Sequence, residues 1–395
     1  MTLKFFFWIV LVTLAYTYAG YGLILFLMVW IRKILGRERQ EIRNPDYEPE
    51  VCLFVTAYNE KDYVRQKVAN SFDLDYPPDK IQYLWVTDGS DDGSPGILQD
   101  YPRIEVIHEP ERRGKVHAMN RGMRFVRTPV VIFSDANTLL SRNTIRRMVA
   151  CFADPTVGCV AGEKRIYEHL ADNASAAGEG LYWRIESKVK QLDARFNSAV
   201  GGVGELFAIR TGLFEPVEDD VLLDDFIISL RIAGKGYRIA YTPDAWAEET
   251  ASLNVKEEMK RKIRIAAGGV QTTFMLPWLL NPFRYGWLSW QYFSHKVLRW
   301  TAAPVFLFLL LPLNIWVVDR NDLWAQPSIY TLLLLLQFVS YLMALVGWIL
   351  ENRKLRNKYL FAPYYFVAIN LSSVRGIIRY FRRQQKVTWE KSKRA

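Results

Sequence analysis

The sequence predicts an α/β domain with a mostly parallel sheet and helices on both faces, joined to transmembrane and interfacial helices. Two observations predict this fold class. Between Glu50 and about Thr250, short apolar runs alternate with stretches of helical periodicity, which is typical of a parallel sheet buried on both sides. Elsewhere the chain of 395 residues carries long apolar runs bordered by basic residues. A composition that is 50% hydrophobic with a mean hydropathy of −0.02 fits membrane segments attached to a soluble domain.

The first apolar run, from Phe5 to Ile31, is long enough to cross a bilayer with some tilt. It is too long for the core of a cleaved signal peptide, and no small-x-small cleavage pattern follows it. Residues 1–33 are therefore predicted to form a transmembrane helix. Two further apolar runs, Val297 to Val318 and Ser328 to Leu350, are separated by a short polar segment. Residues 297–350 are accordingly predicted to form two more transmembrane helices.

The net charge is +10, and basic residues crowd beside the apolar runs: Arg32, Lys33, Arg37, Arg39, Arg353, Lys354, Arg356 and Lys358. This placement indicates contact with membrane lipids, and no nucleic acid partner is expected. The positive-inside rule puts the N-terminus outside and residues 34–250 in the cytoplasm, beneath a plasma (inner) membrane. The run from Tyr359 to Val374 is shorter and is interrupted by Pro363. Residues 351–395 are predicted to be a re-entrant or interfacial segment and a basic cytoplasmic tail, because a full crossing would put that tail outside.

Residues 251–296 are predicted to form amphipathic interfacial helices. One helical face carries apolar side chains: Val255, Met259, Ile263, Ala266, Val270 and Phe274. Four basic residues lie off that face: Lys260, Arg261, Lys262 and Arg264. The tryptophans at 278, 287, 290 and 300 suit the level of lipid headgroups. Arg261 and Arg264, one turn apart, are candidates for binding either a diphosphate or lipid headgroups.

Strands are predicted, in order, at residues 51–58, 81–88, 104–109, 129–137, 157–162, 206–211 and 237–242. Helical spacing follows the first of them at Val64, Val68 and Phe72, and follows the fourth from Ile145 to Phe152. In open parallel sheets, ligands bind beyond the carboxyl ends of the strands. Polar residues at those ends are therefore the first candidates for a functional site.

The segment TDGSDDGS, residues 87–94, ends the second predicted strand and has the composition of a tight turn. A calcium loop is excluded, because position twelve would be Gln99 instead of a glutamate and a strand precedes the loop. Two interpretations remain, a solvated turn and a nucleotide site. Asp88 stands at the strand end, where its carboxylate can accept hydrogen bonds from a nucleoside.

A second polar cluster, SDAN, ends the fourth predicted strand. Asp135 and Asn137 are two residues apart, so an extended chain presents both on the same side. Divalent cations prefer oxygen ligands and share them with phosphates, although a capping turn is the alternative. Lys115 adds a cation in a glycine-bearing loop; an ordinary surface lysine is the alternative there.

Adjacent carboxylates, Asp224 and Asp225, precede the helical run FIISLRIAG. A carboxylate at a helix N-terminus is stabilised by the helix dipole, and this role explains one of the two aspartates readily and the second less so. Gly201, Gly202 and Gly204, followed by Glu205, form a stretch that allows either loop flexibility or the close passage of a sugar. The cysteines, Cys52, Cys151 and Cys159, include no CxxC pair, and the four histidines have no close spacing, so no His/Cys metal centre is expected.

Taken in order, the segments TAYNE, TDGSDDGS, RGKVHAMN, SDAN, GGVGELFAIR and LDDF, followed by KRKIR and membrane spans, resemble those of membrane-bound family 2 glycosyltransferases. The group that holds cellulose, hyaluronan and poly-N-acetylglucosamine synthases is the most similar. The resemblance covers about Glu50 to the C-terminus, and the ordered set is specific although each segment alone is not. It implies a GT-A fold, a nucleotide-sugar donor, usually a UDP-sugar, and a Mg²⁺ or Mn²⁺ ion.

The resemblance also implies roles for individual residues. Tyr58, Glu60, Asp88, Lys115 and Asp135 would bind the nucleotide-sugar, and Asp135 with Asn137 would hold the metal. Asp225 would be the general base, and the acceptor would be bordered by Gly201, Gly202, Gly204, Glu205 and Asp224. Arg261 and Arg264 would bind the diphosphate, and Trp389 would belong to a C-terminal gating segment. Three positions depart from the pattern: Asn137 replaces an aspartate, Arg261 a glutamine, and Ile265 the tryptophan that supports the acceptor sugar.

The sequence therefore predicts an inverting hexosyl- or N-acetylhexosaminyltransferase that extends a polysaccharide at the cytoplasmic face of the membrane. Transfer of one sugar to a lipid or lipid-linked acceptor is the alternative enzyme, and a non-catalytic nucleotide-binding scaffold is the alternative from another class. The predicted membrane segments are few for an enclosed channel. An export partner or a homo-oligomer is therefore expected if a polymer is secreted.

Overall fold

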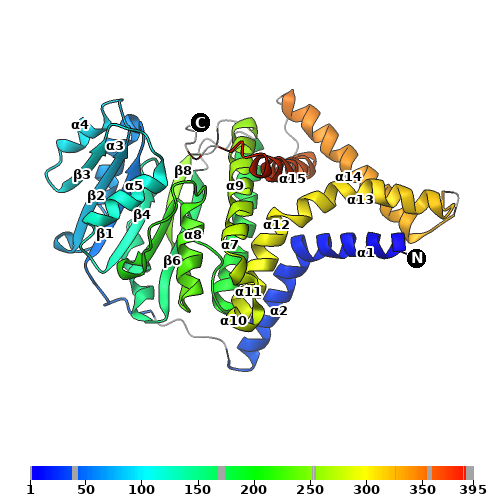
Figure 1. Cartoon of the computed structure of the whole chain (residues 1–395), viewed down its shortest axis with the longest axis horizontal. Helices are drawn as coiled ribbons and strands as arrows, with labels where there is room; N and C mark the ends of the chain where they lie inside the picture. Colours follow the sequence, from blue (N-terminus) through cyan, green and yellow to red (C-terminus); the bar gives the residue numbers. More distant parts are fainter. Residues whose placement is uncertain are drawn as a thin grey trace.

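The computed structural model describes residues 2–37, 43–167, 174–250, 252, 255–324, 326–353, 358–385 and 387. Figure 1 shows a sheet with flanking helices, coloured blue to green, beside a group of helices drawn from both ends of the chain. The N-terminal helix packs on helices near the C-terminus, through Phe7, Val10 and Leu14 against Ala303 and Leu310. Apolar side chains that the N-terminal helix alone would leave exposed are thus covered by helices that are distant in the sequence.

The sheet lies in the part of the described chain from Val51 to Thr250, here called the sheet domain. Its strands are β1 (Val51–Ala57), β2 (Ile81–Asp88), β3 (Ile104–Glu109), β4 (Val130–Asp135), β5 (Leu139–Leu140), β6 (Val157–Tyr167), β7 (Leu206–Arg210) and β8 (Arg238–Thr250). The spatial order is β3-β2-β1-β4-β7-β6-β8-β5. The pairs β1–β2, β1–β4, β2–β3 and β6–β8 are parallel, whereas β7 and β5 run antiparallel to their neighbours.

Helices cover both faces of this sheet, as the sequence predicts. They are α3 (Lys61–Phe72), α4 (Ser94–Gln99), α5 (Lys115–Gly122), α6 (Thr144–Val149), α7 (Ala174–Phe196) and α8 (Asp224–Gly234). Alternate residues of β1 point to opposite faces: Phe54 packs in a core with α5 and α8, and Leu53 packs in a core with α3 and α6. The predicted α/β fold class, with a mostly parallel sheet, is confirmed.

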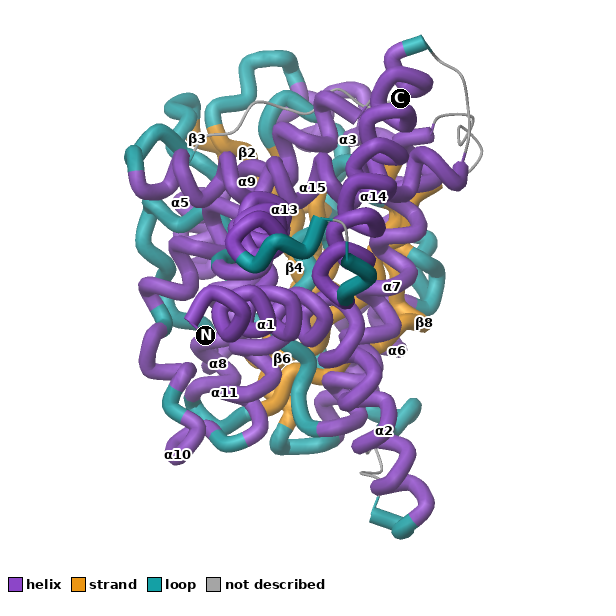
Figure 2. The backbone as a smooth tube through the Cα atoms, turned by 90° about the vertical axis from the view of Figure 1, so that its right-hand side faces the viewer, coloured by secondary structure: helices purple, strands orange, loops and turns teal. Residues whose placement is uncertain are grey.

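The remaining helices are α1 (Thr2–Ala15), α2 (Tyr21–Ile34), α9 (Val255–Met275), α10 (Pro282–Tyr285), α11 (Trp287–Tyr292), α12 (Leu298–Trp300), α13 (Ala302–Arg320), α14 (Ile329–Asn352) and α15 (Lys358–Phe381). Figure 2, viewed from the side on which α1 lies, shows these helices in front of the strands. Within the described residues, three helical segments are long and apolar enough to cross a membrane: Thr2–Ile34, Ala302–Arg320 and Ile329–Asn352.

The first candidate span is bent. A π-helix at Tyr16–Gly20 separates α1 from α2, and in Figure 1 α1 runs with α13 while α2 turns down along the sheet domain. A second π-helix, Phe293–Val297, precedes α12. Tyr16 from the first π-helix and Ser294 from the second share a hydrogen bond of 2.7 Å between their hydroxyls. Such π-turns are rare and are found mostly at functional sites.

The helix α9 differs from the predicted interfacial helix. Its predicted apolar residues Val255, Ile263 and Val270 are buried, because α15 packs on them instead of lipid. Most of its basic face is enclosed too: Lys262 is 5% exposed, and Arg261 and Arg264 line a cavity of the sheet domain, whereas Lys260 is exposed. Trp300, predicted at the headgroup level, packs edge-on against Phe226 with ring centroids 5.0 Å apart. These residues contact protein because α9 lies against both α15 and the sheet domain.

The helix α15 is continuous through Pro363 and is not among the candidate spans. Figure 1 shows it nearly end-on, crossing the direction of α1 and α13. Its placement as an interfacial or re-entrant element stays a prediction. Trp389, predicted to gate the site, lies outside the described residues.

Candidate active site

Two joined cavities open at the carboxyl ends of the parallel strands. The first encloses about 690 Å³, its open mouth included, and is bordered by Tyr58, Glu60, Asp88 and Asn137 among others. The second encloses about 1250 Å³, counted in the same way, and reaches from Asp225 to Trp300. Lys115, Asp135 and Glu249 line both cavities. Residues from distant parts of the sequence are therefore gathered around one continuous space.

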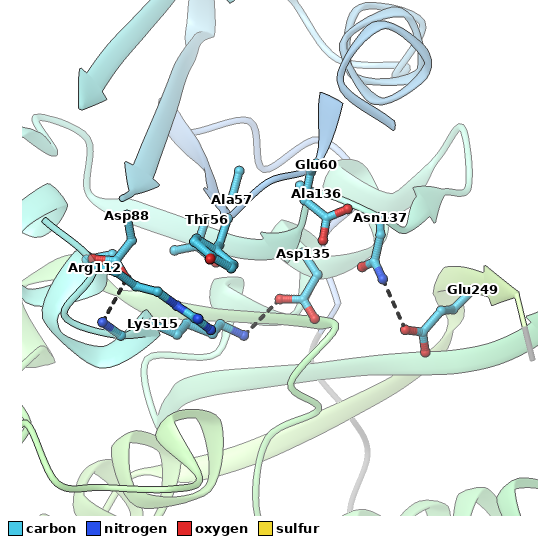
Figure 3. Close-up of a pocket in the computed structure, with 13 residues that line it drawn as sticks. Thr56, Ala57, Glu60, Asp88, Arg112, Lys115, Asp135, Ala136, Asn137 and Glu249 are labelled. Carbon is cyan, nitrogen blue, oxygen red and sulfur yellow. Dashed lines mark hydrogen bonds and ion pairs between the residues drawn. The ribbon is translucent and has the colours of Figure 1, made fainter. Parts of the chain in front are cut away.

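Strand register explains why the first cavity forms where it does. Thr56 of β1 lies opposite both Asp135 of β4 and Val86 of β2, so the three strands end at nearly the same level. Figure 3 shows Asp88 on one side of the cavity, Asp135 at its centre, and Asn137 with Glu249 on the other side. The parallel order thus places the polar residues that follow three strands at one edge of the sheet.

Asp88 fixes the loop that carries Lys115. Its Oδ1 accepts a hydrogen bond from the Arg113 amide at 3.1 Å, and its Oδ2 accepts one from the Gly114 amide at 2.7 Å. The guanidinium of Arg112, in the same loop, lies 3.8 Å from the centroid of the Tyr58 ring. Asp88 therefore positions this loop as well as bordering the cavity where a nucleoside is expected.

The rest of the TDGSDDGS segment is a turn held to the start of α3. Asp92 accepts hydrogen bonds from the Ser94 and Lys61 amides, both at 2.9 Å. The Asn59 side chain donates to Asp91 at 2.8 Å. The last residues of the segment thus form a turn, as one of the two interpretations predicts. Its first carboxylate, Asp88, lines the cavity, and its role toward a nucleotide stays a prediction.

Lys115 joins the two cavities. Its Nζ lies 2.8 Å from Oδ1 of Asp135 and 3.4 Å from Oδ2 of Asp224, and Figure 3 shows it pointing at Asp135. Burial by itself lowers the pKa of the ammonium, but the charges of Asp135 and Asp224 outweigh burial and raise it. Lys115 is therefore a fixed cation between carboxylates from β4 and from α8, and not an ordinary surface lysine.

Asp225 follows Asp224 at the first turn of α8 and lines the second cavity. Burial first, and then the charge of Asp224, raise the pKa of its carboxyl to about 7 against the opposing charge of Lys115. A carboxylate with a pKa near the working pH is suited to take up a proton during a reaction. The double aspartate is thus more than a helix cap.

The glycine-rich stretch passes directly over Asp225. Gly201 has a φ of +93°, and a Cβ there would meet the Phe226 ring at 2.3 Å, so only glycine fits. A Cβ at Gly204 would lie 3.6 Å from the Asp225 carboxyl carbon. The Gly204 carbonyl also accepts a hydrogen bond from Lys115 at 3.4 Å. These glycines keep the space beside Asp225 open.

Arg261 and Arg264 both line the second cavity, one helical turn apart on α9. Arg261 lies 3.4 Å from Glu258 and 3.7 Å from Glu249. Arg264 donates to the Leu222 carbonyl at 2.9 Å, on the segment that leads into Asp224. The two arginines thus have different surroundings, with Arg261 in a carboxylate network and Arg264 beside the double aspartate.

Glu205 belongs to that network. The ammonium of Lys164 contacts both Glu205 and Glu249. Burial works against ionisation of Glu205, but Lys164 and Arg261 hold its pKa below its usual range. Glu205 therefore anchors the glycine-rich stretch to β6 and β8 as an ionised carboxylate.

A family model described as "Glycosyltransferase like family 2" matches residues 49–268, the region that supplies most of these side chains. The chain belongs to this family. A solved structure, that of a mannosyltransferase from Pyrobaculum calidifontis in complex with GDP-Man and Mn²⁺, superposes with a TM-score of 0.70, at 23% identity, over 95% of this chain and 99% of the other. That likeness shows the fold, so the predicted GT-A-like architecture is confirmed.

Curated relatives of this family 2 glycosyltransferase include enzymes with different acceptors. A beta-monoglucosyldiacylglycerol synthase of Synechocystis sp. is 28% identical over 237 residues, covering 56% of this chain and 48% of the relative. A poly-beta-1,6-N-acetyl-D-glucosamine synthase of Staphylococcus aureus is 25% identical over 239 residues, covering 57% of this chain and 56% of the relative. The chain thus matches about half the length of these relatives. The predicted resemblance to family 2 glycosyltransferases is confirmed.

The family implies a divalent cation, and the residues around Asp135 fit one. Among the described residues no group of three His, Cys, Asp or Glu side chains converges on one point. Mg²⁺, however, is commonly held by one or two protein oxygens together with substrate phosphates. The Asn137 nitrogen donates to Glu249 at 3.5 Å, and Figure 3 shows its oxygen turned toward Asp135. Asp135 and Asn137 thus offer two oxygens on the same side.

Sequence reasoning missed several residues of the second cavity in this glycosyltransferase: Trp183, Glu186, Lys190, Glu249, Lys296, Arg299 and Trp300. Most come from α7, which was not predicted, or from the segment between α11 and α13, where Lys296 was assigned to an interfacial helix and Arg299 and Trp300 to the start of a transmembrane helix. No local motif marks them. The one signal in the sequence is the run HKVLRW, which places two cations beside a predicted span.

Proposed function

We propose that this family 2 glycosyltransferase transfers a sugar from a nucleoside diphosphate sugar, with inversion, to a hydroxyl of an acceptor held in the second cavity. The observation that carries the proposal is the contact of Lys115 with Asp135 and Asp224 at the junction of the two cavities. It supports a donor on the Asp135 side and an acceptor on the Asp225 side. A UDP-sugar is the donor expected from the sequence, and a GDP-sugar is the one named for the structural neighbour.

The reaction is a single displacement. Asp225 accepts the proton of the acceptor hydroxyl as its oxygen bonds to the anomeric carbon. The bond from that carbon to the diphosphate breaks, and the diphosphate leaves with the electron pair. Lys115 and Arg264 stabilise its charge, and a Mg²⁺ or Mn²⁺ ion held by Asp135 and Asn137 would neutralise part of it. A positioned base contributes about 10²–10⁴-fold to such a rate.

Relatives in this family are named as synthases of a glucosylated diacylglycerol and of a polysaccharide, which makes a lipid or lipid-linked molecule and a growing polysaccharide both candidate acceptors. The sequence favours the polysaccharide. Two observations favour the lipid-linked acceptor: Ile265 stands where polymer synthases carry a tryptophan, and the second cavity extends to Arg299, just before the candidate span Ala302–Arg320. A non-catalytic scaffold is the remaining alternative.

A donor screen tests the proposal. UDP-glucose, UDP-N-acetylglucosamine and GDP-mannose are offered to the purified protein with Mg²⁺ or Mn²⁺, and nucleotide release and product mass are measured. One donor is expected to be consumed. The variant Asp225→Asn should bind that donor with unchanged affinity but transfer its sugar at least about 10²-fold more slowly. The control variant Asp219→Asn, an exposed carboxylate in the loop before α8, should retain full activity.

The outcomes separate the alternatives. Normal turnover by Asp225→Asn would remove Asp225 from the mechanism. A protein that binds a nucleotide but releases none from any donor would be the scaffold. A product that grows by many sugars would identify a polysaccharide synthase, and a product one sugar heavier than its lipid would identify the alternative.

A further inference from the structure

Three cations stand at the end of the second cavity that is nearest to the candidate spans. Lys190 comes from α7, Lys296 from the π-helix before α12, and Arg299 from α12, and all three line the cavity together with Asp225. Lys190 is 6% exposed and Lys296 is 8% exposed. None of these residues belongs to a motif of the family, and the displacement described above uses none of them.

The three cations differ in the carboxylates that they contact: Lys296 and Arg299 contact Glu186 directly, whereas Lys190 is influenced by the charges of Glu186, Asp225 and Glu205 without a direct ion pair to any of them within the part of the chain that the structure describes. Glu186 contacts both Lys296 and Arg299, with 2.7 Å to the Arg299 Nη1. Asp193, the next carboxylate on α7, is bonded to the His295 ring at 2.6 Å and to Gln291 at 2.9 Å. It is therefore already satisfied.

Lys190 is the unusual member of this cationic group. Its Nζ has three donors, and its contact in the described chain is the neutral carbonyl of Gly202 at 3.1 Å. Burial lowers the pKa of this ammonium, and the nearby charge of Lys296 lowers it further. A buried cation paired with a neutral acceptor is costly unless an anion arrives to complete the site.

The cationic group is held in place by a rigid frame. The His295 ring spans Asp193 and Glu186, at 2.6 Å and 3.2 Å, and the Tyr21 hydroxyl of α2 donates to Asp193. The frame thus ties α7 and the second π-helix to the first candidate span, Thr2–Ile34. An anion bound here would meet preorganised donors at the level where membrane helices begin.

Position along the cavity assigns that anion to the acceptor. Lys115 touches Asp224 on one side of the catalytic base. Lys190 touches the carbonyl of Gly202, where an added Cβ would lie 3.4 Å from the Asp225 Cβ. Lys190, Lys296 and Arg299 line the second cavity with Asp225, and none of them is among the described residues that border the first cavity, where the donor is proposed. An inverting displacement requires the acceptor oxygen to approach opposite to the leaving diphosphate. A phosphate beside Lys190 therefore belongs to the acceptor, whose hydroxyl attacks the anomeric carbon, and not to the donor.

We propose that Lys190, Lys296 and Arg299 bind the phosphate of a membrane-anchored acceptor, so that the acceptor is a lipid-linked phosphate ester whose sugar hydroxyl reaches Asp225. This inference rests on the proposed function and narrows its acceptor class. The hydroxyl loses its proton to Asp225 and gains the anomeric carbon. The phosphate ester of the acceptor is neither made nor broken.

Binding is the direct test, because it does not require turnover. The protein is placed in phosphatidylcholine nanodiscs, and equilibrium binding of dodecylphosphoryl-glucose is compared with that of dodecyl glucoside. We expect the phosphate compound to bind at least about tenfold more tightly, the factor that corresponds to ~1.4 kcal/mol. Equal affinities in the wild type would overturn the inference whatever the fate of the donor screen.

Variants locate the effect. In Arg299→Met and Lys190→Met, the ratio of the two affinities should fall toward one, whereas Lys235→Met, a surface cation paired with Glu215 at 2.8 Å, should keep the wild-type ratio. The melting temperature of each variant shows that it is folded. If a variant loses nucleotide affinity but keeps the wild-type ratio of the affinities for dodecylphosphoryl-glucose and dodecyl glucoside, these cations bind the donor and the proposal is wrong.

A third ligand separates the two sources of phosphate. Glucose 1-phosphate carries the anion without the alkyl chain, and it should bind far more weakly than dodecylphosphoryl-glucose. If both bind alike, the site recognises a soluble phosphate and the membrane-anchored acceptor is wrong. If the donor screen fails but the lipid phosphate still binds selectively, the proposed function fails and the assignment of the anion site survives.

Discussion

Asp225 lies where its neutral form is favoured, and this sets the pH range in which it can act as a base. Burial and the charge of Asp224 raise its pKa to about 7. Below that pH the carboxyl is protonated in the folded enzyme and cannot accept the acceptor proton. The value of kcat/KM should therefore fall about tenfold per pH unit below 7 and be level above it, in an initial-rate profile from pH 5 to 8.5.

A variant assigns that profile to the double aspartate. Asp224→Asn removes the neighbouring negative charge that raises the Asp225 pKa, so the falling limb should move to lower pH even if the maximal rate declines. A rate that is constant between pH 5 and pH 8 in the wild type would show that Asp225 does not titrate as described.

At the residue scale, the sequence was informative where a side chain ends a strand. Asp88 and Asp135 follow buried strands whose ends the parallel order aligns, so their proximity was predictable. Glu249 lies at the far end of β8, beyond the apolar run that predicts this strand. Glu186 and Lys190 share a helix with residues in no recognisable motif. Their proximity to Asp225 depends on how α7 packs, which no local pattern encodes.

At the element scale, the close contact of α9 with α15 positions the arginines of the site. Gly376 of α15 permits this contact, because a Cβ there would lie 2.6 Å from the Ile263 carbonyl oxygen and 2.9 Å from the Ala267 amide nitrogen. Backbone atoms cannot move aside as a flexible side chain can. Gly376→Val should force α15 away from α9 and destabilise the protein by about 1–3 kcal/mol, and activity should fall because α9 carries Arg264.

Thermal melting in detergent measures this effect. Gly96→Val is the matched control, since nothing lies within 4 Å of an added Cβ in α4. The two variants change the same atoms at sites with different neighbours. Equal melting temperatures for them would mean that the contact between α9 and α15 contributes little to stability.

The elements that the sequence predicted well are those with one dominant pattern. Strands β2 and β3 have the predicted bounds, because each is rich in β-branched or aromatic residues and is flanked by residues typical of turns. Strand β6 continues to Tyr167 and β8 to Thr250 through polar residues. Pairing between the two strands, and not an apolar sequence, holds these residues in the sheet. The interfacial character expected of α9 stays a prediction, although Arg261 and Arg264 line a cavity, because an amphipathic pattern alone cannot distinguish a cavity from a lipid headgroup.

At the scale of the whole molecule, the candidate site lies between the sheet and the helices that include the candidate membrane spans. The described chain gives this arrangement a direction. In Figure 1 the N-terminus and the connection from α13 to α14 lie at the end of the molecule farthest from the sheet. Basic residues lie at the opposite ends of these helices, with Arg32 and Lys33 in the last turn of α2 and Arg353 after α14. A bilayer between the two levels would place the acceptor cavity directly beneath the lipid.

This direction predicts the orientation of the protein, because basic residues remain on the cytoplasmic side. Its three cysteines are buried, so the wild type should resist a membrane-impermeant maleimide and single cysteines can be introduced without removing any. Gln326→Cys, exposed before α14, should react in intact cells. Asp79→Cys, exposed before β2, should react only after permeabilisation. The reverse pattern would place the sheet domain outside, away from the nucleotide sugars that are made in the cytoplasm, and would leave the active site without its donor.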